Sequence, residues 1–281
     1  MFYKLGLINS LRRVRSMDLV YLMKKELFRR GYSPRTLDAY TNSVSNFLKK
    51  CKKDPKKVTK KDVRDYLYYL AEKGMARSTL NLNLQALKFA LINILGKRFI
   101  LSLPGSKKAT RLPIVLSKKE VSRIFEAIKN KKHRLMIKLL YSAGLRVSEL
   151  VKLKVEHIDL DNMYGWVRRG KGNKDRMFII AESIKDDLNE IIEKSYLFKG
   201  RRGHISVRTI QQIVKKATLK ARIRKKVNCH TFRHSFATHL IEDGYPITTV
   251  QVLLGHKSVE TTMIYVHIAR PSMLDVKSPL D

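Results

Sequence analysis

The sequence predicts a mainly α-helical protein of two domains, one all-helical and one mainly helical with a small three-stranded antiparallel sheet. Apolar residues recur at helical spacing through most of the chain. Short runs rich in Val, Ile, Met and Trp, separated by turn residues, lie between Val155 and Ile180 and indicate the strands. Pro104, Gly105 and Pro113 interrupt the helical pattern near the middle of the chain and indicate a linker.

The first domain, residues 17–98, is expected to contain four helices, and residues 1–16 are expected to precede it as an extension. Ser33 followed by Pro34 is typical of an N-cap and the first position of a helix. Ser78 is expected to open the last of the four helices. The apolar positions that follow each start lie on one face, as in a small helical bundle.

The linker, residues 99–116, and the second domain, residues 117–270, follow in order. The linker is basic, so it could cross a DNA backbone or simply be a solvated connector. Ser117 with Glu120 is a capping-box pattern and marks where the second domain begins with a helix. The final segment, residues 271–281, could dock into a neighbouring subunit or be a frayed tail.

Charge dominates the composition. Lys and Arg number 59 against 24 Asp and Glu, for a formal net charge of +35. An excess this large favours an anionic partner. Because the sequence contains no apolar run of about 20 residues, nucleic acid is favoured over a membrane. Two cysteines, with no CxxC pair, fit a reducing compartment, and we expect a cytoplasmic, nucleoid-associated protein.

Four local motifs in the second domain point to chemistry, and the first surrounds Arg146. Its neighbours Leu145 and Val147 are apolar, and a guanidinium in such a setting needs an anionic partner. Glu149, three residues further along a predicted helix, can be that partner. A structural ion pair and a ligand-binding arginine therefore both remain open at this point.

The second motif, Gly170–Arg176, is predicted to form the tip of a β-hairpin. Its glycines would let the backbone approach a ligand closely and would leave Lys171 at a reachable tip. The motif is not a phosphate-binding P-loop, because no Ser or Thr follows the lysine. A surface turn with exposed lysines is the alternative interpretation.

The third motif places His230 and Arg233 three residues apart at the start of a helix, on one side of it. His230 and His234 could instead bind zinc, but Thr231 stands where an HExxH motif has its glutamate. We therefore expect no metal at this motif. His234 and His239 are interpreted as packing residues.

The fourth motif is Leu254, Gly255 and His256, with Tyr265 nine residues after the histidine. A lone tyrosine between two apolar residues is usually a core residue with its hydroxyl at the surface. Tyr265 therefore gains a functional interpretation only together with the other three motifs.

In this order the four motifs resemble those of the tyrosine recombinase (phage integrase) family, most closely its Xer-type members of bacteria and archaea. The resemblance implies that the first domain is a SAM-like core-binding domain that clamps DNA, and that the second is the catalytic domain. The catalytic residues it implies are Arg146, Lys171, His230, Arg233, His256 and the nucleophile Tyr265, with Glu149 as support. The DNA contacts that we expect beside them are Lys107, Lys108, Arg111, Lys174 and Arg176.

The implied activity is site-specific recombination of duplex DNA through a covalent 3′-phosphotyrosine, with no cofactor, metal or ATP. The implied partners are double-stranded DNA carrying a recombination site and further copies of the chain, as a tetramer on DNA. Chromosome dimer resolution and the integration or excision of a mobile element both fit. Two alternatives stay open: a catalytically silent DNA-binding protein of the same fold, and a type IB topoisomerase-like enzyme that relaxes DNA.

Overall fold

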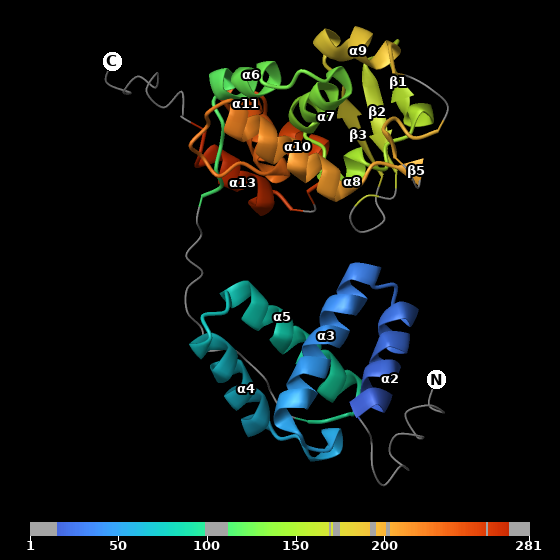
Figure 1. The fold of residues 1–281 in the computed structure, drawn as a ribbon, viewed down its shortest axis with the longest axis vertical. Coiled ribbons are helices and arrows are strands. Elements are labelled where there is room, and N and C mark those ends of the chain that lie inside the picture. Colours follow the sequence, from blue (N-terminus) through green and yellow to red (C-terminus); the bar gives the residue numbers. More distant parts are fainter. Residues whose placement is uncertain are drawn as a thin grey trace, which may run out of the picture. The chain divides into compact units, whose positions relative to one another are not determined.

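The computed structural model describes most of the chain, namely residues 16–98, 112–168, 170, 175–191, 195–200, 203–256 and 258–269. The chain divides between Lys108 and Ala109 into two compact units, and Figure 1 shows the fold of each. This division falls within the expected linker, most of which lies outside the described residues, as does the C-terminal segment 271–281. No helix in the described ranges is both long and apolar enough to cross a membrane.

The first unit is helical throughout its described part. Its elements are α2 (Ser16–Arg29), α3 (Pro34–Cys51), the 3₁₀ turn η1 (Pro55–Lys57), α4 (Lys60–Glu72), α5 (Arg77–Lys88) and a π-helical continuation of α5, η2 (Phe89–Ile94). Helix α3 packs against α2, α4 and α5, as Figure 1 shows. The apolar faces of these helices enclose one core, in which Phe47 is fully buried. The expected four-helix unit is confirmed.

Of the two helix starts predicted above for the first unit, one lies where the capping residue indicates and the other does not. The Ser33 side chain accepts a hydrogen bond from the backbone N–H of Thr36, and Pro34 is the first helical residue. The predicted start at Ser78 is wrong by one residue, because α5 begins at Arg77 and its N-cap makes no side-chain hydrogen bond. The start of α5 is therefore defined by the backbone conformation of Ala76 and not by a capping side chain.

The second unit is mainly helical and contains the expected three-stranded sheet. Its helices are α6 (Lys118–Glu126), α7 (Lys131–Ser142), α8 (Val147–Leu150), α9 (Lys185–Asn189), α10 (Val207–Lys220), α11 (Cys229–Glu242), α12 (Ile247–Leu254) and α13 (Glu260–Val266), with 3₁₀ turns η3 (Val155–His157) and η4 (Glu182–Ile184). Its strands are β1 (Ile158–Asp159), β2 (Tyr164–Val167), β3 (Arg176–Ile179), β4 (Lys199–Gly200) and β5 (Gly203–His204).

Strands β1, β2 and β3 form an antiparallel sheet in chain order, as predicted. Strands β4 and β5 form a separate two-stranded ribbon that the sequence did not predict. The ribbon strands have two residues each, too few for an alternating pattern to be visible.

Helix α11 is the element around which the second unit is organised. It packs against α7, α10, α12 and α13. Most of its residues are buried, polar ones included, so it has no solvent-facing polar side in its middle. Buried polar groups need partners. The hydrogen-bond partners of the buried polar side chains of α11 therefore show which groups this helix brings together.

Candidate active site

Arg146 and Glu149 form the first part of the site at the start of α8. Glu149 accepts a hydrogen bond from the Arg146 backbone N–H at 2.9 Å and a second from the Arg146 guanidinium Nη1 at 2.7 Å. The Glu149 side chain is only 5% exposed, whereas that of Arg146 is 19% exposed. Glu149 thus holds one edge of the Arg146 guanidinium, and other donors of that guanidinium remain for an anion.

A second arginine pairs with the same carboxylate. Arg176, at the start of β3, donates from Nη2 to Glu149 Oε2 at 2.7 Å and from Nη1 to the Leu253 carbonyl oxygen. Burial by itself would raise the pKa of Glu149, but Arg176 and then Arg146 outweigh it, and the pKa lies below its ordinary value. Glu149 is therefore a buried carboxylate that stays ionised between two guanidiniums.

Arg176 was expected to contact DNA, and the structure shows its contacts within the protein. Its side chain is almost completely buried, and its guanidinium is directed at Glu149 and a backbone carbonyl. Arg176 therefore braces Glu149 and the end of α12 within the protein, and its expected contact with DNA stays a prediction. The other expected contacts, Lys107, Lys108, Arg111 and Lys174, lie outside the described residues, as does Lys171.

Arg233, in the middle of α11, is the most deeply buried cation of the site. It donates from Nη1 to the Gly144 carbonyl oxygen at 2.5 Å and from Nη2 to the Leu254 carbonyl oxygen, and His256 Nε2 lies 3.4 Å from Nη2. Burial and then the charges of Arg146 and Arg176 lower its pKa to about 9. Arg233 stays positively charged at neutral pH, and Arg146 lies near enough to repel it.

His256 joins this arginine to the last helix. Its Nδ1 lies 2.9 Å from Thr262 Oγ1 of α13, and its ring is stacked on that of Tyr265 at an angle of 17°. Burial and then Arg233 lower its pKa to about 4, so the imidazole is neutral at pH 7. With Nε2 accepting from Arg233, Nδ1 carries the proton and donates to Thr262.

Tyr265, on α13, has its ring inside this group. The residue is 3% exposed and packs with Phe236 and Leu254 in a small apolar cluster. Its hydroxyl oxygen lies 3.1 Å from His234 Nδ1. Burial raises the pKa of Tyr265, although Arg233 and Arg146 act in the opposite direction. The hydroxyl is therefore protonated at neutral pH and lies within the field of both arginines.

His234 is the residue whose place in the site the sequence interpretation missed, because we took it for a packing histidine. His230, one of the implied catalytic residues, is exposed at the first turn of α11. Burial and then Arg233 lower the pKa of His230, and its ring centroid lies 6.4 Å from that of His234. The available signal was spacing, since His230 and His234 are four residues apart and share a helix face.

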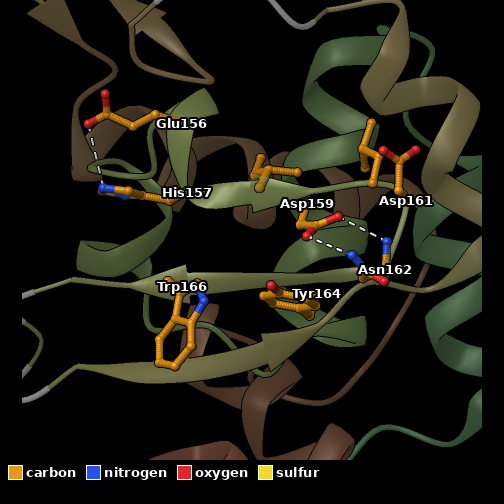
Figure 2. A pocket seen from close by; sticks show the side chains of 9 residues that line it. Glu156, His157, Asp159, Asp161, Asn162, Tyr164 and Trp166 are labelled. Atoms are coloured by element: carbon orange, nitrogen blue, oxygen red, sulfur yellow. Dashed lines mark hydrogen bonds and ion pairs between the residues drawn. The ribbon is translucent and has the colours of Figure 1, made fainter.

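A pocket of about 470 Å³ opens elsewhere on this unit, over η3, β1 and the turn into β2. Figure 2 shows Glu156, Asp159 and Asp161 at its rim, with the rings of Tyr164 and Trp166 on the adjoining strand. Asp159 accepts two hydrogen bonds from Asn162, which closes the turn. The carboxylates would repel a phosphate, so this pocket is not a site for the anionic partner that the charge of the chain favours.

The candidate residues that the structure describes thus come together from four elements: Arg146 before α8, His230 and Arg233 on α11, His256 after α12 and Tyr265 on α13. Two guanidiniums beside a phenol are suited to an anion that gains charge as the phenol oxygen attacks it. Within the described ranges, no group of three His, Cys, Asp or Glu side chains could hold a metal ion.

A tyrosine beside two arginines and two histidines, on a helical unit with a three-stranded sheet, is the arrangement of a tyrosine-type recombinase. The chain belongs to the phage integrase family. Residues 115–271 match the model of the Phage integrase family, and residues 19–100 match that of the Phage integrase, N-terminal SAM-like domain.

Individual relatives agree with this assignment. Tyrosine recombinase XerA of Pyrococcus furiosus is 37% identical, over 85% of this chain and 85% of its own. The XerH recombinase, in a post-cleavage complex with a palindromic difH substrate, has a TM-score of 0.73 at 23% identity, over 93% of this chain and 85% of its own. A lambda integrase tetramer on a Holliday junction has a TM-score of 0.72 at 21% identity, over 92% and 79%. The two solved structures share the fold, and the family establishes a tyrosine-type site-specific recombinase.

Proposed function

We propose that this chain cleaves and rejoins duplex DNA at a specific site through a covalent 3′-phosphotyrosine on Tyr265. The observation that carries the proposal is that Tyr265, on α13, lies beside Arg233 of α11, the helix against which α13 packs, with His256 in contact with both residues. The charges of Arg233 and Arg146 both act on the Tyr265 hydroxyl. A phosphodiester gains negative charge on its nonbridging oxygens as an oxygen attacks phosphorus. Arginines fixed before the reaction stabilise that charge without having to reorganise.

Each group has a role that its surroundings support. Arg146 has free donors and partial exposure, so it can bind a nonbridging oxygen while Glu149 holds its other edge. His230 is exposed at the N-terminal turn of α11 and can donate to the phosphate or receive the tyrosine proton. We assign the protonation of the departing 5′ oxygen to Lys171, on the segment between β2 and β3.

Attack by Tyr265 forms a bond from its oxygen to phosphorus, and the bond from phosphorus to the 5′ oxygen breaks. The products are a 3′-phosphotyrosine and a free 5′-hydroxyl, so the phosphodiester energy is kept in the new linkage. A 5′-hydroxyl from a partner duplex can reverse the step, which converts cleavage into strand exchange. Neither ATP nor a metal ion is needed, because one phosphoester bond forms for each one that breaks.

The proposed partners are double-stranded DNA with a recombination site and other copies of this chain, as a tetramer on DNA. The net charge of +35 and the DNA complexes of XerH and lambda integrase support this assignment. Because its proposed substrate is DNA, we also propose that the protein acts at the nucleoid. Chromosome dimer resolution and integration or excision both require this same chemistry, so either fits the proposal.

The test is a duplex with a nick close to the cleaved position, which releases a short fragment and traps the adduct. Its sequence is taken from random duplexes that become covalently linked to the wild-type chain. We expect wild type to form the adduct and Tyr265→Phe to form none. Tyr141→Phe is the matched control, because Tyr141 is also hydrogen-bonded to a histidine of α11, His239, at 2.8 Å.

Three outcomes contradict the proposal. If wild type forms no adduct, the chain is a silent DNA-binding protein of this fold. If wild type forms the adduct but a plasmid with two sites is only relaxed and never converted into recombinant circles, the chain acts as a type IB topoisomerase. Adducts that persist in Tyr265→Phe would assign the nucleophile to a different residue.

A further inference from the structure

We propose that His234 is a positioning residue for the nucleophile: its Nδ1 fixes the hydroxyl of Tyr265 relative to Arg233. This inference rests on the proposed function of Tyr265. It assigns a part in DNA cleavage to a histidine that is neither in the implied catalytic set nor a ligand of the phosphate.

The first support is the hydrogen bond itself. His234 Nδ1 lies 3.1 Å from Tyr265 Oη, and the two ring centroids are 5.7 Å apart. Among the hydrogen bonds of the described residues, this is the one made by the Tyr265 hydroxyl. His256 contacts the same tyrosine through its ring face, so it constrains the plane of the phenol and not the position of its oxygen.

The second support is the direction of the hydrogen bond. Burial, then His230 and Arg233, lower the pKa of His234 to about 4, so its imidazole is neutral at pH 7. The Tyr265 hydroxyl is protonated, since burial raises its pKa. The phenol O–H therefore donates and His234 Nδ1 accepts, with the imidazole proton on Nε2. The lone pairs of the phenol oxygen stay available for attack on phosphorus.

The third support is the element from which His234 projects. It follows Arg233 directly on α11, a helix buried among four others. Tyr265, by contrast, lies on the seven-residue helix α13. A helix this short gains little order from its own hydrogen bonds and depends on packing for its position. His234 thus ties the nucleophile to the same rigid helix that carries a phosphate-binding arginine.

Two hydrogen bonds hold α13 in place, and each joins it to a histidine outside this helix. His256 Nδ1 holds Thr262, and His234 Nδ1 holds Tyr265 three residues later on the same helix face. The Thr262 contact fixes the helix, and the Tyr265 contact fixes the reacting oxygen. A misplacement of about 1 Å at a reacting atom can lower a rate about 100-fold.

The experiment is single-turnover cleavage at saturating DNA, with the nicked duplex selected by the wild-type chain as described above. His234→Ala removes the acceptor, and we expect the cleavage rate constant to fall by about 10- to 100-fold. The affinity for the same duplex, measured by fluorescence anisotropy, should stay unchanged, because the proposed phosphate contacts are assigned to other residues than His234. This separates positioning of the nucleophile from DNA binding.

His234→Asn is the decisive variant. The Asn side-chain oxygen can occupy the place of Nδ1 and accept the phenol hydrogen bond, although an amide cannot take up a proton. We expect His234→Asn to cleave within a few-fold of wild type. If His234→Asn is as slow as His234→Ala, acceptance of a hydrogen bond is not what His234 contributes, and the inference is wrong.

The matched control is His239→Ala, which removes a comparable histidine–tyrosine hydrogen bond from the same helix, to Tyr141. We expect it to cleave at the wild-type rate. Equal slowing of His239→Ala and His234→Ala would assign the effect to a weakened α11, and a His234→Ala rate at or above wild type would also overturn the inference. If wild type itself forms no adduct, the proposed function fails instead.

Discussion

The histidines of α11 and His256 are held neutral by their surroundings, and this has a consequence for stability. Burial and nearby cations lower the pKa of His234 and His256 from 6.5 to about 4. In the unfolded chain the same histidines take up protons near pH 6.5. The unfolded state therefore binds more protons than the folded state between about pH 4 and 6.5.

We predict that the second unit loses stability as the pH falls from 6.5 towards 4. The contribution of His234 and His256 is complete above pH 6.5 and is lost progressively as the pH approaches their folded pKa of about 4. Urea unfolding at several pH values measures this dependence. His234→Asn should flatten it, because an amide takes up no proton. A free energy of unfolding that is constant over this pH range would contradict the prediction.

At the level of residues, the sequence predicted the site where a motif is local and failed where a contact is distant. Arg146 and Glu149 are three residues apart, so their ion pair was among the expected alternatives, and it is present. The contact of His234 with Tyr265 spans 31 positions. Likewise, Arg176 meets Glu149 across 27 positions, and nothing near Arg176 in the sequence reveals that it will be buried.

At the level of elements, helix starts were predicted well at Ser33 and Ser117, where a side chain caps the helix. Ser117 and Glu120 form the predicted capping box at the start of α6, with both reciprocal hydrogen bonds present. The start of α5 was less well predicted, because Ala76 is its N-cap and offers no acceptor. The β4–β5 ribbon was missed because two-residue strands carry no periodic signal.

The turn between α7 and α8 links packing to the site through Gly144. This residue has φ +56°, and a Cβ placed there would lie 2.5 Å from Phe236 Cδ1. Its carbonyl oxygen accepts the hydrogen bond from Arg233 Nη1. Both the left-handed backbone and the close approach to the Phe236 ring of α11 therefore require glycine here.

We predict that Gly144→Ala destabilises the second unit and weakens the hydrogen bond that Arg233 donates to the backbone of this turn. Gly244→Ala is the matched control, since Gly244 also has a positive φ, +85°, but no atom lies within 4 Å of a Cβ placed there. The comparison isolates the clash from the backbone strain. The free energy of urea unfolding should fall by about 1–3 kcal/mol more for Gly144→Ala than for Gly244→Ala. Equal losses would show that the Phe236 ring moves aside without cost.

At the level of the whole molecule, the 59 Lys and Arg outnumber the 24 Asp and Glu that could pair with them, which leaves the net charge of +35. Lysines such as Lys118 and Lys131 are paired with exposed carboxylates, at 2.6 Å from Asp243 and 3.0 Å from Glu190 respectively. Exposed pairs of this kind contribute little to stability, but they cancel charge locally. A DNA backbone should therefore be bound by the cations that lack such partners.

The linker residues expected to contact DNA offer the sharpest test of this view. We predict that replacing Lys107, Lys108 and Arg111 together by Gln weakens binding to duplex DNA and makes it less dependent on salt. Each phosphate contact contributes about 0.9 to the slope of log affinity against log salt concentration. The slope should therefore become smaller by about 3, as measured by anisotropy titrations from low to physiological salt.

A matched triple variant separates this effect from a simple loss of net charge. Lys118, Lys131 and Lys154 are each hydrogen-bonded to an exposed carboxylate, and their replacement by Gln changes the net charge by the same amount. The charges of these three lysines are already compensated by Asp243, Glu190 and Glu156. The lysines should therefore release few counterions from DNA when the protein binds. We expect the slope of this control to stay close to that of wild type. Equal changes in the two triple variants would mean that overall charge, and not contact by residues 107–111, sets the affinity.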